Sequence, residues 1–335
     1  MRRPRVLVVD DSAFARSVIT RLLTASHRID VVGKAPDGYA ALERIAELDP
    51  DVVTLDLTMP ELDGIGVLRA LVGRSRPRVI VVSISGVDTE LGAEALTLGA
   101  IDLVTKPTAL ASDRLQAIGD ELIAKVLAAG LPAPSTLAHP ATRVDSAPRP
   151  DLVMIGCSTG GPQALTRVIG ALPADLPFPV AIALHIPAGY TESLAARLDR
   201  MAKARVIEAK SGLLLEPGLV VLARGGEHLR VHRRGSGLVV EVSPLPPRDF
   251  APSVNELFLS GARAVGSGAL GIVLTGMGDD GLEGCRAIAS AGGALLTESA
   301  ATCVVYGMPR VVYEADLGAS SIPLDQIANE ITRRG

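Results

Sequence analysis

The chain alternates short apolar runs with segments of helical periodicity, and it does so twice, on either side of a proline-rich stretch. Continuous Val, Ile and Leu runs between helices are typical of parallel strands that are buried on both faces of a sheet. Residues 129–150 lack periodicity and are rich in Pro, Ala and small polar residues, as exposed linkers are. The sequence therefore predicts two doubly wound parallel-sheet α/β domains, 1–128 and 151–335, joined by a linker over 129–150.

The apolar runs and the periodic segments also predict individual strands and helices. In the first domain, the predicted strands are 5–9, 31–35, 51–55, 78–82 and 102–105, and the predicted helices are 13–25, 38–48, 64–72, 88–98 and 110–128. In the second domain, we expect parallel strands at 152–156, 180–184 and 270–276. Gly pairs break the apolar runs of 205–243, so we expect antiparallel hairpins inserted there.

Composition and charge exclude several classes of protein. The net charge of −4 over 335 residues offers no basic excess for broad nucleic-acid binding. Three cysteines cannot all pair, which favours a reducing cytoplasm. No apolar stretch approaches the roughly 18 residues of a membrane helix, and two aspartates end the first apolar run too early for a signal peptide. We therefore expect a cytoplasmic protein without direct membrane insertion.

Polar side chains follow the predicted strands of the first domain. Asp10 and Asp11 come after the first strand, Asp56 after the third, Ser83 after the fourth and Lys106 after the fifth. Because ligands of parallel sheets bind beyond the carboxyl ends of the strands, we expect these groups to converge. Three neighbouring carboxylates repel one another unless a cation lies between them, and such oxygen ligands suit Mg²⁺. The site favours transfer of a phosphoryl group to a carboxylate, with Asp56 as the acceptor.

The motifs VVDDS, DVVTLDLTMPELDG and VTKP together resemble the receiver domain of response regulators, which has a flavodoxin-like fold. The resemblance implies that Asp56 is the phospho-acceptor. The Mg²⁺ ligands that it implies are Asp10, Asp11, Asp56 and the backbone carbonyl of Thr58, and the implied phosphoryl contacts are Ser83 and Lys106. Leu103 stands where receivers often carry an aromatic residue, so switching by that aromatic group is not expected.

The second domain opens on DLVMIGCSTGGPQAL, where a strand ends in a glycine-rich turn. The turn contains G-x-S-x-G and also nearly matches a dinucleotide-binding loop. Ser158 stands where that loop needs a glycine for close approach to pyrophosphate, and His185 follows the next strand where an acidic residue would stand. These two departures favour a serine nucleophile, with Cys157 beside it as a small buried residue.

A serine nucleophile needs a base and a group that orients the base. His185 follows a parallel strand on the same predicted sheet edge as Ser158, and Asp279 and Asp280 both follow a third such strand. Their chain order of Ser, His, Asp differs from that of the α/β-hydrolases, which does not argue against the chemistry. His228 and His232 could form an H-x-x-x-H zinc pair, but no third ligand is evident, so we expect a solvated strand face.

The motifs IGCSTGGPQAL, ALHIPAGYT, PSVNELF, VLTGMGDDG and YGMPR resemble the catalytic domain of chemotaxis protein-glutamate methylesterases. The resemblance implies a Rossmann-like esterase domain with Ser158 as nucleophile, His185 as general base and Asp280 as the orienting carboxylate. It also implies an oxyanion-binding region at the backbone N–H of Met277, with Thr159 nearby.

Together the two resemblances imply a phosphorylation-regulated serine hydrolase that demethylates glutamate methyl esters, and deamidates glutamines, on methyl-accepting chemotaxis receptors. A chemotaxis histidine kinase would supply the phosphoryl group, Mg²⁺ would serve the receiver, and ester hydrolysis would need no cofactor. Phosphorylation would stop the receiver from obstructing the triad. Two alternatives stay open: an adaptor with a catalytically retired esterase domain, or the same esterase in a sensory pathway other than chemotaxis.

Overall fold

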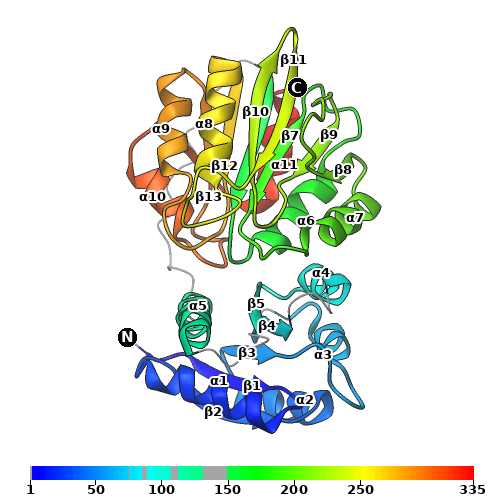
Figure 1. Ribbon diagram of the computed structural model, residues 1–335, viewed down its shortest axis with the longest axis vertical. Helices are drawn as coiled ribbons and strands as arrows, with labels where there is room; N and C mark the ends of the chain where they lie inside the picture. The colour runs from blue at the N-terminus through cyan, green and yellow to red at the C-terminus, as the bar shows by residue number, and fades with distance from the viewer. Residues whose placement is uncertain (1, 75, 85–88, 107–111, 131–148) are drawn as a thin grey trace. The chain divides into compact units, whose positions relative to one another are not determined.

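The computed structural model describes residues 2–74, 76–84, 89–106, 112–130 and 149–335 (Figure 1). The chain falls into two compact units, Met1–Pro132 and Ala133–Gly335, which are described one at a time. Most of the expected linker over 129–150 lies outside the described residues, and the last helix of the first unit extends to Gly130. Within the described ranges, no helix has the length and apolar character required to cross a bilayer.

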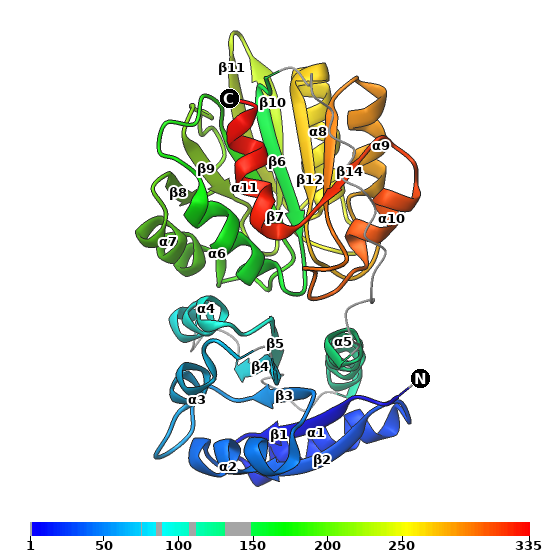
Figure 2. The ribbon, with the colours of Figure 1, turned by 180° about the vertical axis from the view of Figure 1, so that it is seen from behind.

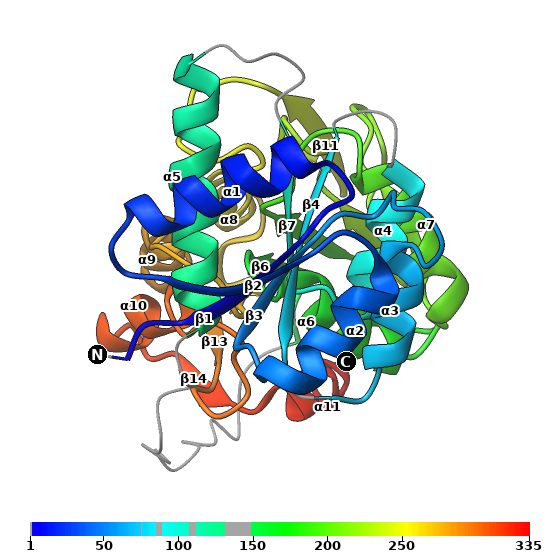
Figure 3. The same ribbon diagram turned by 90° about the horizontal axis from the view of Figure 1, so that it is seen from below.

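The first unit has a parallel five-stranded sheet in the order β2-β1-β3-β4-β5. Its strands are β1 (Arg5–Val9), β2 (Asp30–Ala35), β3 (Val52–Leu55), β4 (Arg78–Ile84) and β5 (Asp102–Lys106). Its helices are α1 (Ala13–Ala25), α2 (Gly38–Leu48), α3 (Gly64–Leu71), α4 (Thr89–Leu98) and α5 (Ser112–Gly130). Figure 3 shows α1 and α5 on one side of the sheet and α2, α3 and α4 on the other, so the predicted doubly wound arrangement is confirmed.

Polar residues at the strand ends also start the helices of this unit. Ser12, Asp37 and Asp63 are the N-caps of α1, α2 and α3, and each side chain accepts a hydrogen bond from a backbone N–H of the first turn. Such caps satisfy donors that have no partner within the helix. The capping side chains therefore fix the ends of the loops that lead from the strands into these helices.

The second unit has a parallel seven-stranded sheet in the order β14-β13-β12-β6-β7-β9-β8. Its strands are β6 (Leu152–Cys157), β7 (Val180–Leu184), β8 (Arg205–Glu208), β9 (Leu219–Leu222), β12 (Ala269–Val273), β13 (Ala294–Glu298) and β14 (Ser320–Ile322). Its helices are α6 (Gly161–Ala171), α7 (Thr191–Met201), α8 (Val254–Val265), α9 (Leu282–Ser290), α10 (Met308–Glu314) and α11 (Leu324–Arg333), with a 3₁₀ turn η1 (Gly266–Gly268). Helices α8 and α9 lie in front of the sheet in Figure 1, and α6 and α11 lie in front of it in Figure 2.

The expected antiparallel insertion over 205–243 is only half correct. Strands β10 (His228–Arg234) and β11 (Gly237–Ser243) form an antiparallel hairpin, but β8 and β9 are parallel strands that extend the main sheet. Every residue of β9 is buried, as in a strand covered on both faces, whereas β10 ends in three exposed residues. Glycines mark turns near the ends of the parallel strands and of the hairpin strands alike. Only the burial of the strands distinguishes a parallel strand of the main sheet from a strand of the hairpin.

The hairpin lies over the sheet beside α8, and the two share one core. Leu229 and Val231 of the hairpin pack in the same buried cluster as Leu257 and Phe258 of α8 and Met154 of β6. This packing fixes the N-terminus of α8 relative to the ends of the central strands.

Strand β6 lies between β7, the next strand in the chain, and β12, which the chain adds later on the opposite side of β6. The strand order therefore reverses at β6. A doubly wound sheet opens a crevice where the strand order reverses, just beyond the carboxyl ends of the strands. The turn after β6 therefore lies at the position where such folds bind their ligands.

Candidate active site

Ser158 lies in the turn between β6 and α6, at the centre of the sheet edge. Its backbone N–H donates to the carbonyl of Thr275 at 3.0 Å, which ties the turn to the segment after β12. Gly160 ends the turn at φ +82°, a conformation that L side chains rarely adopt. A Cβ at Gly276 would lie 2.9 Å from the Cβ of Ser158, so this position must be a glycine for the two segments to approach.

Cys157, next to Ser158, is completely buried. Burial raises the pKa of its thiol, with a further contribution from the nearby Glu298 carboxylate. A thiolate is the nucleophilic form of cysteine, and burial disfavours that form here, whereas the Ser158 side chain next to it is half-buried.

His185 directly follows β7, and its backbone N–H donates to the carbonyl of Cys157 at 3.0 Å. Its imidazole Nε2 lies 2.8 Å from Oδ2 of Asp280, and its side chain is only 8% exposed. Because the carboxylate accepts, a neutral ring in this position carries its proton on Nε2 and presents the lone pair of Nδ1. Nδ1 is buried and has no hydrogen-bond partner within the described ranges.

Asp280 precedes α9 in the chain, and its carboxylate packs against the N-terminus of α8, where four hydrogen-bond donors surround it. Oδ1 accepts from the Ser253 hydroxyl at 2.9 Å and the Asn255 N–H at 3.0 Å. Oδ2 accepts from the Val254 N–H at 2.7 Å as well as from His185. Burial alone would raise the pKa of Asp280, but the His185 contact and the backbone N–H groups outweigh it and lower that pKa. Asp280 is thus held as an anion, while its neighbour Asp279 is exposed.

Ser158, His185 and Asp280 follow three adjacent strands, β6, β7 and β12, and lie beyond their carboxyl ends. A hydrogen bond joins His185 directly to Asp280. Across the described residues, the Ser158 hydroxyl makes no hydrogen bond to His185. Catalytic hydrogen bonds of free enzymes are often long and tighten only when substrate binds. Met277 is half-buried and Thr159 is buried, and both lie in the segments that meet at Ser158.

In the first unit, Asp10, Asp11 and Asp56 each offer an oxygen within 4.8 Å of the other two. Asp10 and Asp56 are buried and Asp11 is exposed. Lys106 lies 2.7 Å from an oxygen of Asp10 and from one of Asp56. A compact set of hard oxygen ligands fits Mg²⁺, which prefers carboxylates and retains several waters.

The charges of this cluster depend on one another. Burial raises the pKa of Asp56, although the hydrogen bond and positive charge of Lys106 oppose that shift. Burial would lower the pKa of Lys106, but the contacts to Asp10 and Asp56 outweigh it and raise the pKa. Ser83 is buried near the end of β4, and it pairs in the sheet with Thr105, the residue before Lys106. Lys106 is thus held as a cation beside the carboxylate of Asp56.

Family models match both units of the chain. The response regulator receiver domain matches residues 6–118, and the CheB methylesterase matches residues 153–331. Protein-glutamate methylesterase/protein-glutamine glutaminase 5 of Myxococcus xanthus (strain DK1622) is 55% identical over 331 residues, which cover 96% of this chain and 95% of that protein. The chain belongs to the CheB methylesterase family.

Further relatives agree with this membership. The protein-glutamate methylesterase/protein-glutamine glutaminase of Symbiobacterium thermophilum is 42% identical over 358 residues, covering 99% of this chain and 98% of that protein. Among solved structures, the CheB methylesterase catalytic domain of Thermotoga maritima is 33% identical with a TM-score of 0.54, covering 55% of this chain and 98% of that one.

Four residues that surround Ser158, His185 and Asp280 have no role in the prediction from the sequence. Ser253, Val254 and Asn255 hold Asp280, and the amide oxygen of Asn255 also accepts from the Gly281 and Gly284 N–H groups at 3.0 and 2.9 Å. Phe250 stacks on His185 with ring centroids 4.2 Å apart and planes 5° apart. A serine before an apolar helix signals an N-cap, but nothing in the sequence indicates which carboxylate the cap meets.

We expect Phe250→Ala to lower kcat for ester hydrolysis about two- to tenfold, because a stacked aromatic pair contributes about 0.5–1.5 kcal/mol and helps to fix the imidazole. Steady-state kinetics of the purified full-length chain would measure the effect, with Phe250→Tyr as the control that retains the ring. An alanine variant with unchanged kcat would show that the stack has no catalytic role.

The expected solvated face with His228 and His232 is wrong for one of the two. His232 is exposed and its Nε2 lies 2.5 Å from Glu241, but His228 is completely buried. Residues 228 and 232 share one face of β10, but only the start of the strand is covered, since the Ser253 N–H before α8 and the Pro246 carbonyl both contact His228, whereas the last three residues of β10 are exposed.

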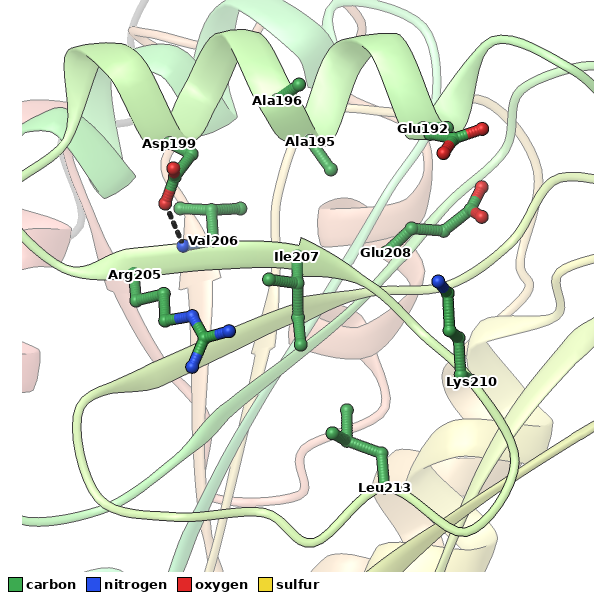
Figure 4. A pocket seen from close by; sticks show the side chains of 10 residues that line it. All are labelled: Glu192, Ala195, Ala196, Asp199, Arg205, Val206, Ile207, Glu208, Lys210 and Leu213. Carbon is green, nitrogen blue, oxygen red and sulfur yellow. Dashed lines mark hydrogen bonds between the residues drawn. The ribbon is translucent and has the colours of Figure 1, made fainter.

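A separate hollow of about 360 Å³ lies between α7 and β8 (Figure 4). Its lining mixes acids and bases, including Glu192, Glu208, Arg205 and Lys210. Asp199 reaches from α7 to accept the Val206 N–H at 2.7 Å, which blocks part of the edge of the sheet. None of Ser158, His185 and Asp280 lines this hollow.

Proposed function

We propose that this chain is a phosphorylation-regulated serine hydrolase that demethylates glutamate methyl esters and deamidates glutamines on methyl-accepting chemotaxis receptors. The observation that carries the proposal is the meeting of Ser158, His185 and Asp280 at adjacent strand ends, with the imidazole bonded to the carboxylate. Relatives that are 55% and 42% identical over nearly the whole chain, both called protein-glutamate methylesterase/protein-glutamine glutaminase, support the substrate class.

Acylation begins when Ser158 Oγ attacks the ester carbonyl carbon and its proton passes to Nδ1 of His185. Asp280 keeps the other ring proton on Nε2 and stabilises the imidazolium that forms. The oxyanion lies against backbone donors at Met277, with Thr159 nearby, and one such donor contributes about 2.7–4 kcal/mol. The imidazolium then protonates the methoxide oxygen, and methanol leaves.

Deacylation follows the same steps with water as the nucleophile. His185 takes a proton from water, and the hydroxide attacks the glutamyl–serine ester. The C–O bond to Ser158 breaks, His185 returns the proton to Oγ, and the receptor glutamate is released. With a glutamine substrate, ammonia leaves in place of methanol in the first half of the reaction.

The receiver regulates this reaction when Asp56 accepts a phosphoryl group from a chemotaxis histidine kinase. The residues that would hold Mg²⁺ are Asp10, Asp11, Asp56 and the Thr58 carbonyl, and those that would contact the phosphoryl group are Ser83 and Lys106. The ion would neutralise charge on the phosphoryl oxygens when it is bound. We place the reaction in the cytoplasm, where the three free and buried cysteines stay reduced.

Methanol release tests the proposal directly. Receptor-containing membranes with labelled methyl esters would be incubated with the full-length chain, with and without a small-molecule phosphoryl donor. We expect labelled methanol to be released, and to be released faster with the donor. A chain that binds these membranes and releases no methanol would be an adaptor, and the hydrolase would be refuted.

We expect Asp56→Asn to keep the basal rate of methanol release and to lose its stimulation, so that the ratio of stimulated to basal rate falls to about one, because an amide cannot form an acyl phosphate. The same assay with and without donor measures this ratio. Asp30→Asn, an exposed position on β2, removes the same charge and should stay responsive. An Asp56→Asn protein that the donor still stimulates would place the acceptor elsewhere.

A further inference from the structure

His228 is a buried titratable group that the reaction itself does not use. It is the first residue of β10 and is completely buried. Its Nδ1 accepts a hydrogen bond from the backbone N–H of Ser253 at 3.1 Å, and its Nε2 lies 2.9 Å from the carbonyl of Pro246. A backbone N–H only donates and a carbonyl only accepts, so the ring is neutral with its proton on Nε2.

The bond from His228 reaches the residue on which the Asp280 site depends. Ser253 is the N-cap of α8, and its hydroxyl donates to Oδ1 of Asp280 at 2.9 Å. The next two backbone N–H groups, those of Val254 and Asn255, donate to the same carboxylate. Three of the four donors around Asp280 therefore belong to residues 253–255, which directly follow the peptide N–H that His228 binds. The fourth donor is His185.

The N–H of an N-cap residue has no acceptor within its own helix, so the peptide before Ser253 is oriented only by groups outside α8. Losing the Nδ1 acceptor would leave this buried N–H unsatisfied, and the peptide would rotate to find another partner. A shift of about 1 Å at a catalytic group can reduce the rate 10²-fold. The second bond of His228, to Pro246, holds the loop that carries Phe250, whose ring covers His185.

We propose that His228 is a positioning residue for the triad: by accepting the Ser253 N–H, it places the N-terminus of α8 so that Asp280 is held against His185. The inference rests on the proposed function only in that hydrolysis is one of its two readouts. The other readout is the hydrogen bond between His185 and Asp280, which requires no substrate.

Two substitutions separate the two hydrogen bonds of His228. In His228→Asn, the amide oxygen occupies the place of Nδ1 and retains the acceptor for Ser253, while the bond to Pro246 is lost. In His228→Gln, the amide nitrogen occupies the place of Nε2 and retains the donor to Pro246, while the acceptor for Ser253 is lost. His232→Asn is the matched control, because His232 lies on the same strand but is exposed and contacts Glu241, away from Ser253.

For the full-length chain, we expect His228→Gln to lower kcat for methanol release about 10- to 100-fold with KM nearly unchanged. His228→Asn should restore kcat to within about threefold of the wild type, as should the His232→Asn control, because both leave the Ser253 bond in place. In proton NMR, the downfield resonance of the proton between His185 and Asp280, assigned by its loss in His185→Gln, should persist in His228→Asn and broaden or vanish in His228→Gln.

The opposite pattern overturns the inference. Equal kcat and an intact downfield resonance in the Asn and Gln variants would show that the Ser253 bond does not position the triad. An equal loss in both, in step with a lower unfolding temperature, would make His228 a purely structural residue. If the wild type released no methanol, the proposed function would fail, and the resonance in the two variants would still decide the role of His228.

Discussion

Ser158→Ala should abolish ester hydrolysis while leaving the chain folded. Removing the nucleophile of a serine triad lowers kcat by about 10⁴–10⁶-fold, and the remaining donors stabilise only the uncatalysed attack of water. The substitution removes one oxygen from a half-buried side chain and leaves in place the backbone bond from the Ser158 N–H to the Thr275 carbonyl that holds the turn. The folded state should therefore lose little stability.

Methanol release in the presence of phosphoryl donor measures this loss, and an unfolding curve checks the fold. Ser193→Ala, at a half-buried position in α7, is the matched control and should retain full activity. Because Ser158 and Asp56 belong to separate units, the Ser158→Ala chain should still accept a phosphoryl group. Substantial methanol release by Ser158→Ala would show that another group is the nucleophile.

Asp280→Asn should have the second largest effect. All four contacts of its carboxylate are donors, so an amide group in any orientation places an N–H₂ against another donor. The amide also lacks the charge that stabilises the imidazolium during attack. In a comparable triad this change lowers kcat by about 10⁴-fold, and we expect a loss of about 10²–10⁴-fold here.

The neighbouring Asp279 provides the control for this experiment. It is exposed, and Asp279→Asn removes the same charge one residue away, so it should stay within about twofold of the wild-type kcat. Methanol release by the two variants, measured side by side, decides which aspartate completes the triad. Equal losses in both variants would contradict the assignment to Asp280.

The lowered pKa of Asp280 also predicts how the free energy of unfolding depends on pH. The pKa of Asp280 is lowered in the folded state, so its carboxylate stabilises the fold above its ordinary pKa and loses that contribution as the pH falls through the lowered value. The wild type should therefore be more stable than Asp280→Asn near neutral pH, and the difference should shrink in strong acid. Denaturant unfolding at several pH values measures it, and a difference that grew in acid would contradict the lowered pKa.

The sequence alone determined much of this protein because its signals are local. Apolar runs between amphipathic segments specify parallel strands and their helices, and the residues just after each strand must lie at one edge of the sheet. Asp10, Asp56 and Lys106 could therefore be placed together in advance, as could Ser158 and His185. The glycine-rich turn also favoured a nucleophile, because Ser158 stands where a dinucleotide loop needs a glycine.

Tertiary structure decided what depends on contacts between distant segments. The position of Asp279 and Asp280 after the same strand did not separate them, and only the family resemblance favoured Asp280, because the choice depends on three donors at the start of α8 that lie about 25 residues earlier in the chain. The sequence also could not show that β9 is buried on both faces, or that His228 lies in the core while His232 lies in solvent. A local pattern specifies which face a side chain occupies, and only packing decides what covers that face.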